Sequence, residues 1–183
     1  IAALATPEAL AQTGQDRMTL LEWAIWNQQA HALAALLRLG ADPCVPGMDG
    51  ESVAHLAASV DDPRYLQVLI EHGAPIDQVG QRAARTPILR AVQSRRDPQV
   101  RLLLAAGADI THSDAMGNTL LHVAAEVNDA ARVLQLLQRG APAKARNQRG
   151  DDFQTALFAG ADDRLSAQGR SERQAVRDWL AAN

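Results

Sequence analysis

The sequence is poor in cysteine and in aromatic residues, and each shortage excludes a class of protein. Cys44 is the only cysteine, so the chain cannot carry an internal disulfide framework or a cysteine-rich zinc site. Aromatic residues make up 3% of the chain, so the core must be built from Ala, Leu, Val and Ile. So few rings also exclude a groove that stacks the bases of a single-stranded nucleic acid.

Strong net charge and long apolar runs are also missing. The net charge is -3, which gives no overall attraction to nucleic acid or to an anionic membrane. No apolar run approaches the roughly 18 residues of a membrane helix, so no membrane span is expected. No signal peptide is visible, but the chain begins at Ile1 and not at Met. The expected location is the bacterial periplasm, if a signal or lipoprotein peptide was removed before Ile1, or the cytoplasm.

An internal repeat is the strongest positive feature. The stretch Thr119-Leu120-Leu121-His122-Val123-Ala124 has weaker counterparts that begin at Thr19, Ser52 and Thr86, with spacings of 33, 34 and 33 residues. A glycine followed by alanine comes 21 residues after each start, at 40, 73, 107 and 140. A fixed period in this range indicates a stack of repeats.

Each repeat is predicted to contain two short helices. Asp62-Pro63, Asp97-Pro98 and Asp129 are expected to start the second helix of their repeats, because Asp caps a helix and proline fits its first position. The glycine that closes each repeat is expected to end that helix in a left-handed conformation. Two such helices cannot bury their own apolar faces, so neighbouring repeats must stack.

These motifs resemble the ankyrin-repeat family, whose unit has about 33 residues, a Thr-Pro-Leu-His-x-Ala core and a Gly-Ala-Asp end. The resemblance implies an all-α solenoid, with inner and outer helices in two layers and loop fingers projecting to one side. It also implies that the fingers and inner helices form a concave binding face. We expect one domain with repeats at about 14–46, 47–79, 80–113 and 114–146.

Both ends of the chain depart from the repeat pattern. Residues 1–13 are expected to form a helical cap, with Thr6 before Pro7 at its start. Residues 147–183 are expected to form a degenerate capping repeat. Its last helix is predicted to open at the capping-box pattern Ser171-Glu172-Arg173-Gln174.

The residues that could carry chemistry are better explained by structure. His55 and His122 occupy the motif histidine, where an imidazole bridges backbone groups of neighbouring turns. The motif Thr and Ser residues are expected to cap helices and not to act as nucleophiles. Nothing near Cys44 indicates an activated thiolate. We therefore expect no catalysis, no cofactor and no metal.

Binding is instead expected at the variable positions around the motif. Trp26 occupies a position that is polar in the other repeats, so it is either an exposed interface anchor or covered by the N-terminal segment. Trp23 is expected in the core. Arginines at 82, 85, 95 and 96 favour a partner with an acidic patch. The candidate partner-binding residues are Trp26, Asn27, Met48, Asp49, Glu51, Arg82, Arg85, Gln93, Met116, Asn118 and Glu126.

Three functions remain open at this stage. The first is a bacterial inhibitor or immunity-type protein, monomeric on its own, that blocks a toxin or enzyme. The second is a secreted effector or scaffold that docks a host or cellular protein. The third is an accessory binding domain of a larger enzyme. The strong preference for arginine, with Lys144 as the only lysine, is typical of GC-rich bacterial genomes.

Overall fold

The computed structural model describes residues 17–183. The predicted N-terminal cap at 1–13 lies outside the described residues. The chain divides into two compact units, residues 1–108 and 109–183, which are described separately. The named elements of residues 17–183 are helices, and an isolated β-bridge joins Ser113 and Thr119.

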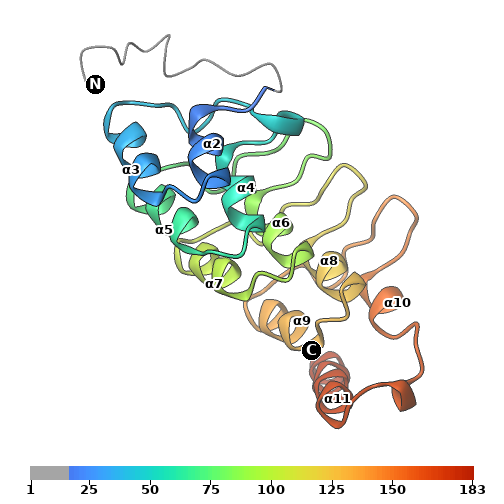
Figure 1. Ribbon diagram of the computed structural model, residues 1–183. Helices are drawn as coiled ribbons and strands as arrows, with labels where there is room; N and C mark the ends of the chain where they lie inside the picture. Colours follow the sequence, from blue (N-terminus) through green and yellow to red (C-terminus); the bar gives the residue numbers. More distant parts are fainter. Residues whose placement is uncertain (1–16) are drawn as a thin grey trace. The chain divides into compact units, whose positions relative to one another are not determined.

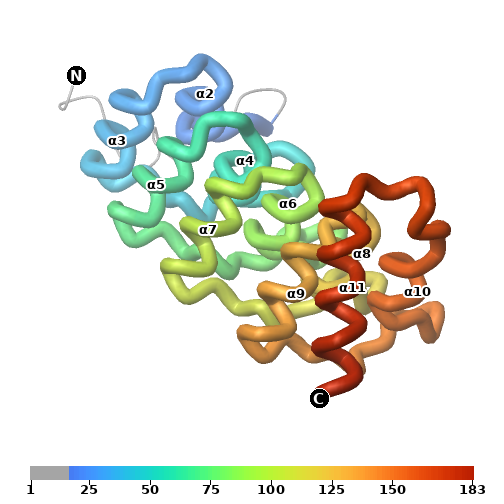
Figure 2. The backbone as a smooth tube through the Cα atoms, turned by 90° about the horizontal axis from the view of Figure 1, so that it is seen from below, coloured from blue at the N-terminus to red at the C-terminus, as the bar shows by residue number. Residues whose placement is uncertain are grey.

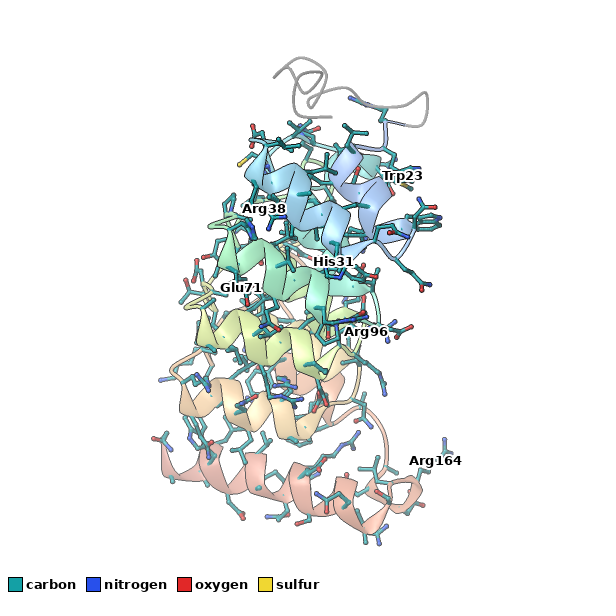
Figure 3. All side chains as sticks on the ribbon, turned by 60° about the vertical axis from the view of Figure 1, so that its left-hand side comes forward. Trp23, His31, Arg38, Glu71, Arg96 and Arg164 are labelled. Atoms are coloured by element: carbon teal, nitrogen blue, oxygen red, sulfur yellow. The ribbon has the colours of Figure 1, made fainter. Side chains whose placement is uncertain are left out.

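Unit 1 contains three helical repeats in two layers (Figure 1). The inner helices are α2 (Leu20–Trp26), α4 (Val53–Ser59) and α6 (Pro87–Gln93). The outer helices are α3 (Ala30–Arg38), α5 (Arg64–Glu71) and α7 (Asp97–Ala105). Within the unit α4 packs against both α2 and α6, and α5 packs against both α3 and α7. Figure 3 views the unit from the outer layer, where His31 and Arg38 project from α3 and Glu71 from α5.

Unit 2 contains one further repeat and the C-terminal end of the chain. Helices α8 (Leu120–Glu126) and α9 (Ala130–Gln138) pack together as the inner and outer pair. The short α10 (Phe153–Leu157) lies against α8, and the long α11 (Ala167–Ala182) lies against α9, as Figure 2 shows from below.

The last helix begins earlier than predicted. It starts after Ser166, whose Oγ accepts a hydrogen bond from the Gly169 N–H at 3.1 Å. Ser171 lies inside α11, so the prediction that Ser171 opens the helix is wrong. The reason is local: two serines five residues apart each offer a cap, and the earlier one adds more than a turn of helix.

The predicted start of the second helix is confirmed in the fourth repeat, where Asp129 is the N-cap of α9. In the second and third repeats the start is shifted by one residue, because Pro63 is the N-cap of α5 and Arg96 is the N-cap of α7. The Asp62 Oδ1 accepts a hydrogen bond from the Arg64 N–H at 2.9 Å, and the Asp129 side chain accepts one from the Arg132 N–H at 2.9 Å. Pro98 lies in the first turn of α7. The closing glycines have left-handed φ angles between 73° and 92°, which a residue with a Cβ atom adopts only at a cost.

Small side chains let the inner helices pack closely. Ala24, Ala57 and Ala91 hold the same repeat position in unit 1, and all three are fully buried. On the outer helices, Leu33 and Leu66 are fully buried at another shared position. Thin inner helices and leucine-filled outer helices explain how a chain with few aromatic residues forms a continuous core in each unit.

The motif histidines bridge backbone groups as predicted. His55 Nδ1 accepts a hydrogen bond from the Ser52 N–H at 3.2 Å, and its Nε2–H donates to the Arg85 carbonyl at 2.8 Å. His122 makes the same pair of contacts, from the Thr119 N–H at 3.2 Å and to the Asp151 carbonyl at 3.0 Å. Each imidazole therefore ties the start of an inner helix to the finger of the next repeat.

His55 should make stability depend on pH in the mildly acidic range. Burial is the main cause that lowers the pKa of His55 from its ordinary value of 6.5. Below that pH the His55 imidazole is protonated in the unfolded chain but stays neutral in the folded chain. Stability is therefore lost as the pH falls. We expect the unfolding free energy in urea to decrease between about pH 7.5 and 5.5, and less steeply in His55→Gln. The exposed His31→Gln variant should keep the wild-type slope, and equal slopes in all three proteins would contradict the assignment.

Candidate partner-binding surface

The predicted binding residues separate into an exposed group and a half-buried group. The exposed residues are Trp26, Asn27, Met48, Asp49, Arg82, Gln93, Met116 and Glu126. The half-buried residues are Glu51, Arg85 and Asn118. Two of the half-buried residues also hold the protein together. Glu51 is paired with Arg90 at 3.1 Å, and the Asn118 Oδ1 accepts a hydrogen bond from the Asn147 Nδ2 at 3.0 Å.

Among residues 17–183, Trp26 is the most accessible of the large apolar side chains. It lies at the end of α2 and is 64% exposed, while the N-terminal segment that was the alternative cover lies outside the described residues. An exposed tryptophan stabilises nothing inside the fold, and tryptophan is the side chain most enriched among interface hot spots. Trp26 is therefore the leading anchor candidate.

The prediction that Trp23 belongs to the core is wrong, since this side chain is 52% exposed. Leu20, one turn earlier on the same helix, is also exposed, whereas its counterpart Val53 is buried. The difference follows from the place of α2 in the stack. An inner helix precedes both α4 and α6 in unit 1, but among the described residues no helix precedes α2. Repeat periodicity alone could not reveal this, because it treats all repeats as internal.

A small pocket of about 110 Å³ lies beside Trp26 on the inner-helix side of unit 1. Trp26, Met48 and Leu56 supply its apolar wall. Its polar wall includes the Glu51–Arg90 ion pair. An apolar wall next to a few fixed charges is typical of a site that receives one anchoring side chain of a partner.

The arginines of the fingers are paired within unit 1. Arg82 contacts Asp49 at 2.6 Å, and Arg96 contacts Asp61 at 2.5 Å. Arg85 donates a hydrogen bond to the Gln93 Oε1 at 2.6 Å. The expected arginine-rich centre is thus a set of mixed pairs, and its charge gives no support to the prediction of an acidic partner.

A buried glutamate replaces the motif histidine in the first repeat. Glu22 Oε2 accepts from the Thr19 N–H at 2.8 Å, and Oε1 accepts from the Met48 N–H at 3.2 Å. His55 and His122 hold this position in the second and fourth repeats, and each donates a hydrogen bond to a carbonyl of the next finger. Glu22 instead accepts a hydrogen bond from an N–H of the next finger. Gly47 fits because a Cβ atom there would lie 1.9 Å from Glu22 Oε2. Met48, which Glu22 holds through its N–H, lines the pocket beside Trp26 together with Asp49.

Unit 2 presents a similar surface at the corresponding positions. Met116 is 51% exposed and holds the repeat position of Asp49, 67 residues earlier. A second pocket of about 190 Å³ is lined by Glu126 and by finger residues that include Arg149 and Asp151. Glu126 holds the repeat position of Trp26, so each unit has a pocket next to that position.

The surroundings of Cys44 do not activate its thiol. Partial desolvation, followed by the neighbouring Asp42, raises the pKa of the Cys44 thiol, which disfavours the thiolate form. Within residues 17–183 no three His, Cys, Asp or Glu side chains are grouped as metal ligands. None of the helices in this range combines the length and the apolar character that a membrane span requires.

Comparison with known proteins identifies the family. The family model for ankyrin repeats, in three copies, matches residues 21–114 and again 54–148. The chain belongs to the ankyrin-repeat family. Three of the four predicted motif starts lie within these matches, and the fourth, Thr19, lies two residues before the first match.

Similar proteins come from bacteria and animals. The chain is 46% identical to Protein PhlB of Serratia liquefaciens over 128 residues, which is 70% of this chain and 56% of PhlB. It is 29% identical to the B-cell lymphoma 3 protein homolog of Mus musculus, over 82% of this chain and 34% of that protein. It is also 29% identical to human neurogenic locus notch homolog protein 1, over 80% of this chain and 6% of that protein. The chain thus spans about half of PhlB and far less of the two animal proteins.

Membership in this family gives the general role. Ankyrin repeats are a protein–protein interaction module. A protein partner is therefore implied.

Proposed function

We propose that this chain is a bacterial inhibitor or immunity-type protein that neutralises a toxin or enzyme by stoichiometric binding. The observation that carries the proposal is Trp26, a 64% exposed ring beside a pocket. A binding module that covers its partner's site needs such an anchor, because a few buried aromatic contacts supply most interface energy. The 46% identity to a Serratia protein supports a bacterial origin.

The anchor is tested with one substitution. Trp26→Ala should weaken partner binding by about 100-fold, in line with the loss of an aromatic hot spot. The helical circular dichroism and the melting temperature should stay close to wild type, because the ring is largely exposed. The partner is first isolated with the wild-type chain from cells that express it natively, and affinity is then measured by calorimetry. His31→Ala, on the outer helix α3, is the matched control and should bind like wild type.

The inhibitory role has its own readout. One equivalent of the wild-type chain should abolish the activity of the isolated partner, and one equivalent of Trp26→Ala should not. Full partner activity in the saturated wild-type complex would contradict inhibition while leaving the binding role intact.

A second candidate, an accessory binding domain of a larger enzyme, is favoured by one observation. The chain spans 56% of PhlB, so related proteins carry more sequence than this chain shows. Under this candidate the partner activity would belong to the same polypeptide, and the complex with a separate inhibited enzyme would not form.

A further inference from the structure

The carboxylates outnumber the arginines in the pockets around Trp26. The ring lines two pockets of unit 1, the small one on the inner-helix side and another of about 410 Å³ at the loops that follow α2 and α4. The first contains Glu22, Asp49 and Glu51 against Arg90. The second contains Asp61 and Asp62 against Arg64.

The same excess recurs in unit 2. The pocket beside Glu126 contains Glu126, Asp151 and Asp152 against Arg149. In three separate pockets of the two units, the lining residues thus include more carboxylates than arginines.

Two of the carboxylates beside Trp26 can exchange their present partners at little cost. The Asp49 and Asp61 side chains are 65% and 89% exposed, and they pair with Arg82 and Arg96. Exposed ion pairs contribute only about 0–1 kcal/mol, so an arriving cation can compete for either carboxylate. Tryptophan is also the aromatic side chain that best attracts a cation to its ring face.

We propose that this surface receives an arginine-containing basic segment of the partner protein. Arginine side chains stack on Trp26 and pair with Asp49 in one pocket and with Asp61 in the other. A guanidinium group suits both contacts, because it is planar, always charged and donates two parallel hydrogen bonds to a carboxylate. The inference rests on the proposed binding role and specifies the chemistry of the segment that is bound.

The experiment uses short peptides and requires no identified partner. The probe is an acetylated, amidated tetrapeptide with two arginines, compared with versions that carry citrulline or glutamate in their place. Binding is followed by the indole N–H signals in nitrogen–proton NMR spectra, with Trp26 identified from the signal missing in Trp26→Phe. We expect the arginine peptide to shift the Trp26 signal to saturation with a Kd of about 1 mM. The citrulline peptide should bind at least about tenfold more weakly, and the glutamate peptide should leave the signal unchanged.

Variants separate this recognition from nonspecific attraction. Asp49→Asn combined with Asp61→Asn should weaken the arginine peptide about tenfold, whereas Asp163→Asn, an exposed acid in unit 2, should have no effect. Arg82→Ala removes a competitor for Asp49 and should tighten binding a few-fold. Equal binding of the citrulline peptide, preference for the glutamate peptide, or no saturable shift would each overturn the inference. Because no partner takes part, these outcomes are distinct from a failure of partner binding in Trp26→Ala.

Discussion

Leu121→Asp is expected to unfold unit 2, with a loss of more than about 4 kcal/mol of stability. Leu121 is fully buried at the second position of α8. A carboxylate there would have no cation to pair with, and it would also leave part of the leucine volume empty. Removing the side chain alone, in Leu121→Ala, should cost about 2–5 kcal/mol through lost burial and the remaining cavity.

The loss should be regional, because the contacts of repeat proteins are made between neighbours. We expect hydrogen exchange to show unprotected amides in α8 to α11 of Leu121→Asp, while α3 to α5 of unit 1 keep substantial protection. The same substitution at Leu39, a 39% exposed residue after α3, should change stability by less than about 1 kcal/mol. Retained protection in α8 would contradict the importance given to this buried position.

The sequence was sufficient to predict the repeat framework because each element of that framework has a local chemical cause. Thr119 is the N-cap of α8, as predicted, with His122 bonded back to it, and Asp129 caps the next helix with its side chain. Glycine at 140 is required by a φ angle of 84°. Each of these features involves residues within one or two turns of each other, so motif and spacing are enough to predict it.

The pairing of charges across neighbouring fingers was missed, although a signal was present. Asp49 and Arg82 are 33 residues apart, which is one repeat period, and they form an ion pair. Gln148 likewise donates to the carbonyl of Ala115, 33 residues earlier. In a stack, residues one period apart lie side by side, so opposite charges at that spacing should be expected to pair. Counting arginines without this rule gave the impression of a basic surface.

The exposure of Trp23 depended on information that periodicity does not contain. Its neighbours in the sequence are ordinary motif residues, and Leu56 at the same position in the next repeat is less exposed. What differs is the absence of a preceding inner helix among the described residues.

The role of Glu22 was also unpredictable. A carboxylate at the histidine position can accept hydrogen bonds but cannot donate them, so Glu22 binds the Met48 N–H instead of a carbonyl.

Arg173→Ala is the second substitution with a large expected effect, because one buried guanidinium joins three segments of unit 2. Its side chain is 6% exposed. It donates hydrogen bonds to the Gly160 carbonyl at 2.8 Å, to Asp162 at 2.9 Å and to Asn128 at 2.9 Å. Removing it leaves those acceptors without their donor, which should destabilise the C-terminal end by about 3–5 kcal/mol. Hydrogen exchange should become fast in α11 and in the segment at 159–166.

Arg177 provides a matched control on the same helix. It also contacts Asp162, at 2.8 Å, and lies over the Phe158 ring, but its side chain is 39% exposed. Solvent screens this pair and replaces its hydrogen bonds, so Arg177→Ala should lose far less stability than Arg173→Ala. Similar losses in the two variants would mean that attraction to Asp162 dominates. A much larger loss at Arg173 would instead show that burial and the contacts with Gly160 and Asn128 hold α11 in place. Repeat periodicity could not reveal these contacts, because α11 lies beyond the last full repeat.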